Sequence, residues 1–440
     1  MAAADVLAPL AARIDAKISG GRPIGLRFWD GSELPGPPGA PVIVVNSPTA
    51  IARVIHERSE LGFGRAFVAG ELDVDGDLGE TLVLSQCFRG IEIDRKDLIA
   101  ALRAARRLKA LPLREPEPPK SEARLRGRLH SLRRDQDAIQ HHYDVSNRFY
   151  RLVLGPTMVY SCAYFASDDE SLDDAQTRKL DVVCRKLNLQ PNERLLDVGC
   201  GWGSLVIHAA QHYGVRAVGV TISPAQAELA RERVREAGLE DAIEIRLADY
   251  RDTDDGPYDT IASVGMVEHV GTAQLPGYFA HLRELLKPGG VLLNHGIVRP
   301  REQKRNPKSF AWRFVFPDGE LQTLSTILTE MENAGFEPRD AESLREHYAL
   351  TLRAWYANQS ANQAQLTREA GEERERIWRL HNIGAALGFE RGDLSVHQVV
   401  AVAPGANHGL PLTRRGAPAE LPRQAPPGAT DTARSEAPRP

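Results

Sequence analysis

One glycine-rich turn constrains the fold of this chain more than any other feature. The turn is LLDVGCGWG, Leu195–Gly203, and it stands between a run typical of a strand and a run typical of a helix. From there to about residue 298, apolar runs of strand length alternate with amphipathic runs of helix length. Strands and helices that alternate at this spacing are joined by right-handed crossovers. The sequence therefore predicts an α/β domain with a mostly parallel sheet and helices on both faces.

The same turn predicts a ligand. Gly199, Gly201 and Gly203 allow a tight turn and a close approach to a bound molecule, and Asp197 ends the preceding strand. Dinucleotide-binding turns usually read G-x-G-x-x-G, whereas the order Asp-Val-Gly-x-Gly is the fingerprint of S-adenosylmethionine (SAM) methyltransferases. An acid is favourable beside the ammonium group of SAM and unfavourable beside a phosphate. We therefore predict a Rossmann-like, class I SAM-dependent methyltransferase fold, and a turn that serves only packing is the alternative.

The second strand of this domain departs from the usual methyltransferase pattern. The strand AVGVTIS would ordinarily end in an acid that binds the ribose hydroxyls, but here it ends at Thr221, with Gln226 five residues later. A hydroxyl and an amide offer the same kind of hydrogen bond without a charge. This substitution points to a particular subfamily.

Four further stretches carry a family resemblance. They are QHHYDVSNRFYRLVLGPTMVYSCAYF, VGVTISPAQ, FVFPDGEL and EHYALTLRAW, and they resemble successive signatures of the cyclopropane fatty acid synthases, including the mycolic acid cyclopropane synthases. The resemblance covers about residues 135–400. The stretch LGFGRAFVAGELDVDGDL also resembles the upstream lipid-binding domain of longer bacterial members. The chain is especially similar to the actinomycete branch that methylates oleoyl phospholipid on the way to tuberculostearic acid.

The resemblance implies the reaction and the residues that carry it. The enzyme would transfer a methyl group from SAM to the cis double bond of a phospholipid acyl chain, which leaves a carbocation in an apolar pocket. In the family a bound bicarbonate ion is the base that removes the proton. Its holders correspond in this sequence to Cys162, Glu268, His295, Ile297 and Tyr348. The cofactor would contact Tyr160, Ser161, Asp197, Gly199, Gly201, Trp202, Thr221 and Gln226.

The predicted ion site has structural alternatives at each position. Glu268 follows a strand-like run, and it is either a wall of the ion site or an acid in the first turn of a helix. His295 is either a site residue or a satisfied core histidine, and Tyr348 is either a donor to the ion or helix packing. Cys162 lacks a visible activating partner, so we expect its backbone to line the site. Ile297 would contribute its backbone only.

Charge chemistry predicts the protonation state of Glu268, whereas the product of the reaction stays open. Because like charges in one site raise the pKa of a carboxyl group, we expect Glu268 to be protonated or to share a proton with the ion. The carbocation has two exits, which the sequence leaves open. Direct proton loss closes a cyclopropane, whereas a prior hydride shift gives a methylene group that a separate reductase would saturate.

Adjacent histidines at His141 and His142 invite a metal interpretation. Neighbours on a helix point about 100° apart, and no third ligand follows at a useful spacing. We therefore predict no metal and a lid helix over the cofactor, with Tyr143 toward the acyl chain. Tyr164, Phe165, Phe310, Trp312, Phe314 and Phe316 are candidates for an acyl tunnel, and plain core packing is the alternative for most of them.

The length of 440 residues predicts more than one domain. Residues 1–115 mix strand-like and helix-like runs and predict a small, lipid-binding-like α+β domain. Pro and charged residues then indicate a basic linker over residues 116–134 and the methyltransferase domain over 135–403. Residues 404–440 are rich in Pro, Ala, Gly and Arg, which is typical of a disordered tail.

The charge distribution predicts a membrane partner. From Arg95 to Arg134 there are 13 Lys or Arg residues against 4 Asp or Glu, which suits an anionic membrane surface. A solvated helix face is the alternative, and the absence of a base-flipping motif argues against nucleic acid. No apolar run in the sequence is long enough to span a bilayer and the start lacks a secretory pattern, so we expect a cytoplasmic, peripherally membrane-associated enzyme. A homodimer is plausible from the resemblance, and an inactive SAM- or lipid-binding module is the competing function.

Overall fold

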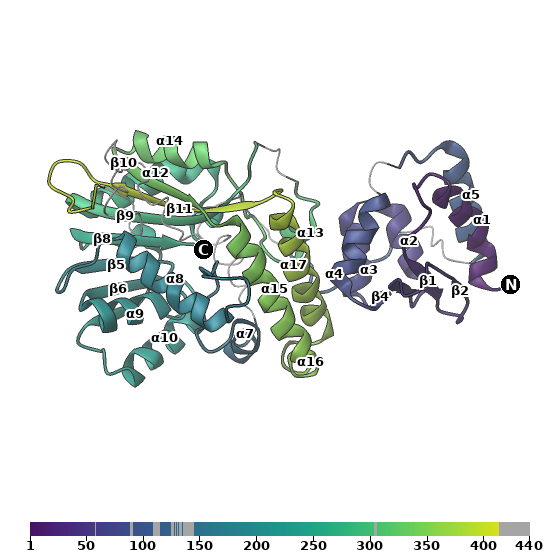
Figure 1. Cartoon of the computed structure of the whole chain (residues 1–440), viewed down its shortest axis with the longest axis horizontal. Coiled ribbons are helices and arrows are strands. Elements are labelled where there is room, and N and C mark those ends of the chain that lie inside the picture. The colour runs from purple at the N-terminus through teal and green to yellow at the C-terminus, as the bar shows by residue number, and fades with distance from the viewer. Residues whose placement is uncertain are drawn as a thin grey trace, which may run out of the picture.

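The computed structural model describes residues 1–57, 59–88, 91–108, 115–124, 127, 129, 131, 134, 145–302 and 306–412. It contains a four-stranded sheet in the N-terminal part and a seven-stranded sheet in the rest (Figure 1). Within these residues, no helix has the length and apolar character needed to cross a bilayer. The predicted lid residues His141, His142 and Tyr143 and most of the predicted tail lie outside the described residues. The domain boundaries stay a prediction.

The N-terminal sheet has the strand order β2-β1-β3-β4. Strands β1 and β2 form a hairpin around Asp30-Gly31, in which Leu26 of β1 pairs with Leu34 of β2 in an antiparallel register. The strands are β1 (Gly25–Phe28), β2 (Glu33–Leu34), β3 (Val42–Val45) and β4 (Leu72–Asp75). The helices are α1 (Ala3–Asp15), α2 (Pro48–His56), α3 (Glu60–Val68), α4 (Leu78–Leu84), the 3-10 helix η1 (Ser85–Phe88) and α5 (Arg95–Arg107).

The seven-stranded sheet confirms the predicted fold class. Its order is β10-β11-β9-β8-β5-β6-β7, and the five strands from β9 to β7 are parallel. Strand β11 is inserted antiparallel between β9 and β10. The strands are β5 (Arg194–Val198), β6 (Arg216–Thr221), β7 (Ile243–Leu247), β8 (Tyr258–Val264), β9 (Leu286–Val298), β10 (Glu337–Ser343) and β11 (Ser395–Val402).

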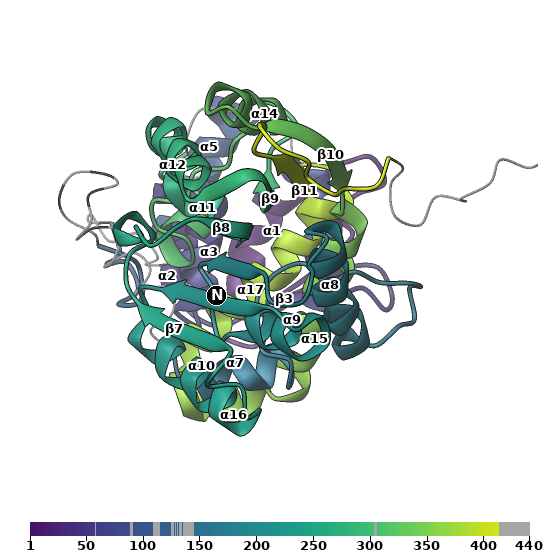
Figure 2. The same ribbon diagram turned by 90° about the vertical axis from the view of Figure 1, so that its left-hand side faces the viewer.

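Helices cover both faces of this sheet. One apolar core joins it to α8 (Leu172–Lys186), α9 (Ser204–Tyr213) and α10 (Pro224–Glu236). A second core joins the opposite face to α12 (Leu275–Glu284) and α14 (Leu324–Asn333), which lie above the strands in Figure 2. The remaining helices include α7 (Asn147–Leu154), α11 (Val267–Val270), α13 (Phe310–Phe314), α15 (Arg345–Ala361), α16 (Gln363–Ala370) and α17 (Glu372–Glu390).

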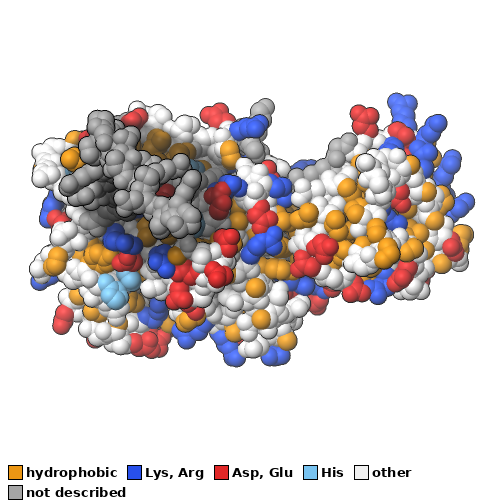
Figure 3. Space-filling view, viewed as in Figure 1, with side chains coloured by type: hydrophobic (Ala, Val, Ile, Leu, Met, Phe, Trp, Pro, Cys, Tyr) orange, Lys and Arg blue, Asp and Glu red, His pale blue; other side chains and the backbone are white. Residues whose placement is uncertain are grey.

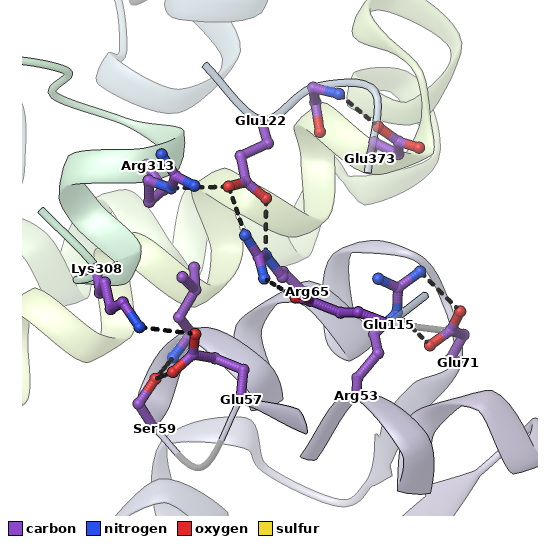
Figure 4. Close-up of polar contacts among 12 residues, drawn as sticks. Arg53, Glu57, Ser59, Arg65, Glu71, Glu115, Glu122, Lys308, Arg313 and Glu373 are labelled. Carbon is purple, nitrogen blue, oxygen red and sulfur yellow. Dashed lines mark hydrogen bonds and ion pairs between the residues drawn. The ribbon is translucent and has the colours of Figure 1, made fainter. Parts of the chain in front are cut away.

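The N-terminal part packs on α13 and α17 through helices α3 and α4 (Figure 1). Gly64 of α3 permits this contact, because a Cβ atom there would lie 2.3 Å from Cδ2 of Phe310. Buried Glu122 joins the two parts: its carboxylate accepts two hydrogen bonds of 2.8 Å from Arg65 and lies 2.8 Å from Nε of Arg313 (Figure 4). The hydrogen bonds to Glu122 raise the pKa of the Arg65 guanidinium above its usual value.

We expect the Glu122→Ala substitution to destabilise this contact by about 3 kcal/mol, because removing one partner of a buried ion pair leaves the other charge uncompensated. Arg65 also forms an ion pair with Glu115, whose side chain is 58% exposed. The measurement is the urea midpoint of unfolding. Exposed Glu117 gives the matched control, and Glu117→Ala should leave the midpoint unchanged. Equal midpoints for the Glu122 variant and the wild type would show that the pair contributes nothing.

Candidate active site

Two adjoining cavities lie at the carboxyl ends of the central parallel strands. The first has a volume of about 160 Å³ and the second about 350 Å³. They share Tyr160, Ser161, Gly265 and His269 as lining residues, so a molecule in one lies next to a molecule in the other. The structure places every predicted cofactor residue in the wall of the first cavity and every predicted ion-site residue in the wall of the second.

The glycine-rich turn forms one side of the first cavity. Gly199 has a φ of +78°, and a Cβ atom there would lie 2.4 Å from Sδ of Met266. This position therefore requires glycine both for its backbone conformation and for the close approach of Met266. Next in the turn, Trp202 is buried and donates from its indole nitrogen to Oδ1 of Asn147 at 2.8 Å.

Thr221 and Gln226 contact each other at the end of β6. The Thr221 hydroxyl donates to Oε1 of Gln226 at 2.8 Å, and the Ser223 N–H donates to the same hydroxyl at 3.2 Å. The hydroxyl proton and the amide oxygen are therefore already engaged. The NH2 group of Gln226 is the donor that this pair offers to a ligand.

Asp197 and Lys179 place opposite charges beside the first cavity. Burial raises the pKa of the Asp197 carboxyl to about 7, and the nearby Lys179 ammonium opposes this rise. Burial lowers the pKa of Lys179 to about 8, and its Nζ donates to Oγ of Ser161 at 3.0 Å. A cavity with a buried acid and a buried lysine suits a zwitterionic ligand.

Sequence reasoning missed Lys179 and the residues that follow β7. Lys179 occupies the buried face of α8 with Ala175, Leu180 and Val183, and a charge on such an apolar stripe was the available signal. Residues 249–251 line the first cavity directly after β7, at the sheet edge where ligands of open α/β folds bind. They also were not predicted.

Glu268 lies in the first turn of the short helix α11 and faces the second cavity. Its Oε1 accepts a hydrogen bond of 2.7 Å from the Ile297 N–H, whereas its Oε2 is buried without a partner among the described residues. Burial raises the pKa of this carboxyl to about 7, and the Ile297 N–H opposes the rise. The backbone contact depends on Gly296, where a Cβ atom would lie 2.3 Å from Cγ1 of Val267.

His295 lies on β9, and its Nε2 is likewise buried without a partner among the described residues. Its Nδ1 lies 3.1 Å from Nε2 of Gln398 on β11. Burial lowers the pKa of the imidazole well below its ordinary value, and the Lys179 and Lys186 charges lower it further. The ring is therefore neutral. Glu268 and His295 each bring one unpaired polar atom to the same cavity.

The other predicted ion-site residues have different surroundings. The Cys162 thiol is fully buried, donates to the Ala163 carbonyl at 3.2 Å, and has a pKa raised by burial, so it is not a thiolate nucleophile. The Ile297 N–H is occupied by Glu268. Tyr348 of α15 lines the cavity, with its ring 4.7 Å from that of Phe389.

Apolar residues form part of the remaining wall of the second cavity, alongside polar ones such as Arg299, Gln322 and His381. Leu352, Trp355 and Phe389 contribute to its wall, and of the aromatic residues expected in an acyl tunnel, Trp312 and Phe316 line it. Phe310 and Phe314 instead belong to the apolar cluster between α3 and α17. Those two residues stabilise the contact with the N-terminal part, so their expected place in the tunnel was wrong.

Comparison with known proteins shows the family to which this chain is related. Residues 130–399 match the family described as mycolic acid cyclopropane synthetase. The chain is 41% identical over 401 residues to a probable fatty acid methyltransferase of Pseudomonas putida, covering 89% of this chain and 95% of that protein. It is 33% identical to tuberculostearic acid methyltransferase UfaA1 of Mycobacterium tuberculosis, covering 87% of this chain and 88% of that protein.

Two further comparisons agree with this placement. The chain is 34% identical to the cyclopropane-fatty-acyl-phospholipid synthase of Escherichia coli strain K12, covering 84% of this chain and 90% of that protein. The structure of mycolic acid cyclopropane synthase CmaA1, solved in complex with SAH and CTAB, superposes with a TM-score of 0.58 at 34% identity, covering 61% of this chain and 98% of that one. The chain therefore belongs to the mycolic acid cyclopropane synthetase family of SAM-dependent methyltransferases.

Proposed function

We propose that this enzyme transfers the methyl group of SAM to the cis double bond of an oleoyl-type phospholipid acyl chain. The carrying observation is that a small cavity with buried charges adjoins a larger cavity whose wall is partly apolar, with Tyr160 and Ser161 lining both. SAM in the first cavity and an acyl chain in the second would bring the sulfonium methyl next to the double bond. Such proximity supplies much of the rate of a bimolecular step.

The first cavity fits the methionine end of SAM. Asp197 would pair with the ligand ammonium, and Lys179 offers a positive charge to its carboxylate. In the transfer step, the π electrons of the double bond form the new carbon–carbon bond while the S–CH3 bond breaks. S-adenosylhomocysteine (SAH) leaves as a neutral sulfide, and the positive charge passes to the acyl chain. The apolar part of the wall, which includes Leu352 and Phe389, offers no nucleophile that would trap this cation.

The family's bicarbonate ion fits the second cavity. The two buried orphan atoms, Oε2 of Glu268 and Nε2 of His295, would each gain a partner from such an ion. With its pKa raised to about 7, Glu268 carries a proton for much of the time near neutral pH, which lessens its repulsion of an anion. Glu268, His295 and Tyr348 would hold the ion, with Cys162 and Ile297 contributing to the wall. When bound, bicarbonate supplies a base for the proton that the carbocation must lose.

The proposed product and lipid substrate can be tested by expressing the enzyme in a host that supplies oleoyl phospholipids and analysing its fatty acids. Expression should give a new fatty acyl species with one additional carbon, carried as a ring or branch on a chain of unchanged length. Proton NMR of the lipids then separates high-field cyclopropane signals from the vinylidene signals of a 10-methylene product, which would require a separate reductase for saturation. An unchanged lipid profile with a folded, SAM-binding protein would contradict the proposed function and favour an inactive binding module.

Helix α5 supports the proposal of peripheral attachment to an anionic membrane. Its outer face carries apolar Ile99 and Leu102, 47% and 41% exposed. The sole acid in the helix, Asp97, is buried and paired with Arg13 and Lys17. Basic side chains gather over this helix at the far end of the N-terminal part (Figure 3). The exposed basic residues of α5 are Arg95, Lys96, Arg103, Arg106 and Arg107.

We expect an Arg103→Glu, Arg106→Glu double variant to bind phosphatidylglycerol vesicles at least about tenfold more weakly at low salt, since each basic residue near such a surface contributes about 1 kcal/mol. Vesicle sedimentation measures this affinity. The matched control reverses exposed Arg216 and Arg235, on β6 and α10, with the same change in net charge. Equal loss in both double variants would show that binding depends on net charge and not on α5.

A further inference from the structure

We infer that Gln398 and Lys186 fix the tautomer of His295, so that the imidazole presents an N–H group from Nε2 to the second cavity. The inference rests on the proposed role of that cavity in the methyl transfer. It assigns Gln398 and Lys186 as positioning residues, and neither lines either cavity.

The row of residues arises from the sheet register. On adjacent strands β10, β11 and β9, Glu342 pairs with Gln398 and Gln398 pairs with His295. Cross-strand partners point to the same face of a sheet, so the three side chains stand in line. Lys186, the last residue of α8, reaches this row from the helix that covers the face. Gln398 is fully buried.

The hydrogen bonds leave one arrangement of protons. Lys186 Nζ contacts Glu342 and donates to Oε1 of Gln398 at 2.7 Å. Because an ammonium group only donates, Gln398 must turn its carbonyl oxygen to Lys186 and its NH2 group to His295. Nδ1 of His295 then accepts that hydrogen bond at 3.1 Å. A neutral imidazole carries one proton, which must therefore reside on Nε2.

The surroundings keep this imidazole neutral. Positive charge faces it from Lys179 and Lys186 of α8, and His397 lies nearby on β11. Glu342 is the carboxylate of the row, and it contacts Lys186 directly. A second proton on Nδ1 would also point at the NH2 group of Gln398, donor against donor. Both effects disfavour the imidazolium form.

The consequence is a defined role for His295. With the proton on Nε2, the ring donates a hydrogen bond into the cavity and holds an anionic oxygen there. It is not the base, because its cavity-facing nitrogen has no lone pair to accept the proton of the carbocation. The side chains of Lys186 and Glu342 are 13% and 19% exposed, so the arrangement is maintained from the edge of the core.

The Gln398→Glu substitution tests this arrangement directly. A carboxylate only accepts, so it should draw the imidazole proton to Nδ1 while still pairing with Lys186. In protein labelled with ¹⁵N-histidine, the NMR signals of His295 should change from the Nε2–H to the Nδ1–H pattern, with a His295→Asn sample for assignment. We expect kcat to fall about 10- to 100-fold, typical for a residue that orients an active-site histidine, with KM for SAM unchanged.

Further variants keep the test decisive. Lys186→Met frees the amide to rotate, so both tautomer patterns should appear. Ser395→Ala removes a 3.4 Å contact to Ser343 between β11 and β10, and it should leave the tautomer and kcat unchanged. A Gln398→Glu protein that retains the Nε2–H pattern would overturn the inference. A switched tautomer with wild-type turnover would support the inference and contradict the proposed role of His295.

Discussion

A Glu268→Gln variant is expected to bind SAM normally and to turn over about 100-fold more slowly, in the range typical of a lost acid–base group. The amide keeps the size of the side chain and still accepts the 2.7 Å hydrogen bond from the Ile297 N–H. It cannot exchange a proton with an ion in the cavity. Turnover under saturating SAM and lipid measures the effect.

Glu320 provides the control for this substitution. Among the described residues it is the other carboxylate in the wall of the second cavity, and it accepts hydrogen bonds of 3.0 Å from the N–H and hydroxyl of Thr272. Glu320→Gln should retain turnover within about threefold, because both hydrogen bonds from Thr272 go to one oxygen that the amide keeps, and a substitution that preserves its contacts costs little. Wild-type turnover in the Glu268 variant would contradict the role assigned to that carboxyl group.

The Glu268→Gln substitution should also change how the stability of the protein depends on pH. Burial raises the folded-state pKa of Glu268 from 4.5 to about 7, so the folded protein binds this proton more tightly than the unfolded chain. That contribution is complete below pH 4.5 and is lost as the pH rises through 7, a change of roughly 3 kcal/mol. Between pH 5 and pH 8 the urea midpoint of Glu268→Gln should therefore fall less than that of the wild type. An identical pH profile would show that the carboxyl does not titrate as proposed.

An Asp197→Ala variant is expected to bind SAH about 100-fold more weakly, because removing one member of a buried charge pair costs 2–5 kcal/mol or more. The carboxylate is the predicted partner of the ligand ammonium, and it is 2% exposed. Isothermal titration with SAH measures the affinity. Asp197→Asn keeps the shape without the charge, so its affinity for SAH should lie between those of the wild type and the alanine variant. Wild-type affinity in the alanine variant would remove Asp197 from the cofactor site.

Cofactor binding should also release a proton near pH 7. Unliganded Asp197 has a pKa of about 7, and a neighbouring ammonium favours its charged form and lowers that pKa. Lys179 has a pKa of about 8, so it is already protonated in most molecules at this pH. Binding heats in buffers of different ionisation enthalpy should therefore differ for the wild type and agree for Asp197→Asn. Equal heats for the wild type would contradict this coupling.

Local patterns predicted the parallel sheet and the first cavity. The glycine turn and the strand ends after Val198 and Thr221 are read from short stretches, and parallel strands bring such ends to one edge. The resemblance supplied the residues of the second cavity, and the fold brings them together. Their roles stay proposals. Glu268 also showed that its two interpretations were compatible, since it starts a helix and faces the cavity.

Contacts between distant segments could not be predicted. Gln398 meets His295 only because β11 inserts antiparallel beside β9, 103 residues later in the chain. Nothing local to "VHQVV" indicates that partner. Phe310 and Phe314 were misassigned for the same reason, because α3, which they pack against, comes from the N-terminal part.

The most direct measurement follows the methyl group itself. Purified enzyme is incubated with dioleoyl phosphatidylglycerol vesicles and SAM labelled in its methyl carbon, and the fatty acids are then released and analysed. We predict one labelled carbon per modified chain at the former double bond, one SAH formed for each, and about 100-fold less label with Glu268→Gln. SAH formation without label in the acyl chains, or label confined to the headgroup, would contradict a transfer to the double bond.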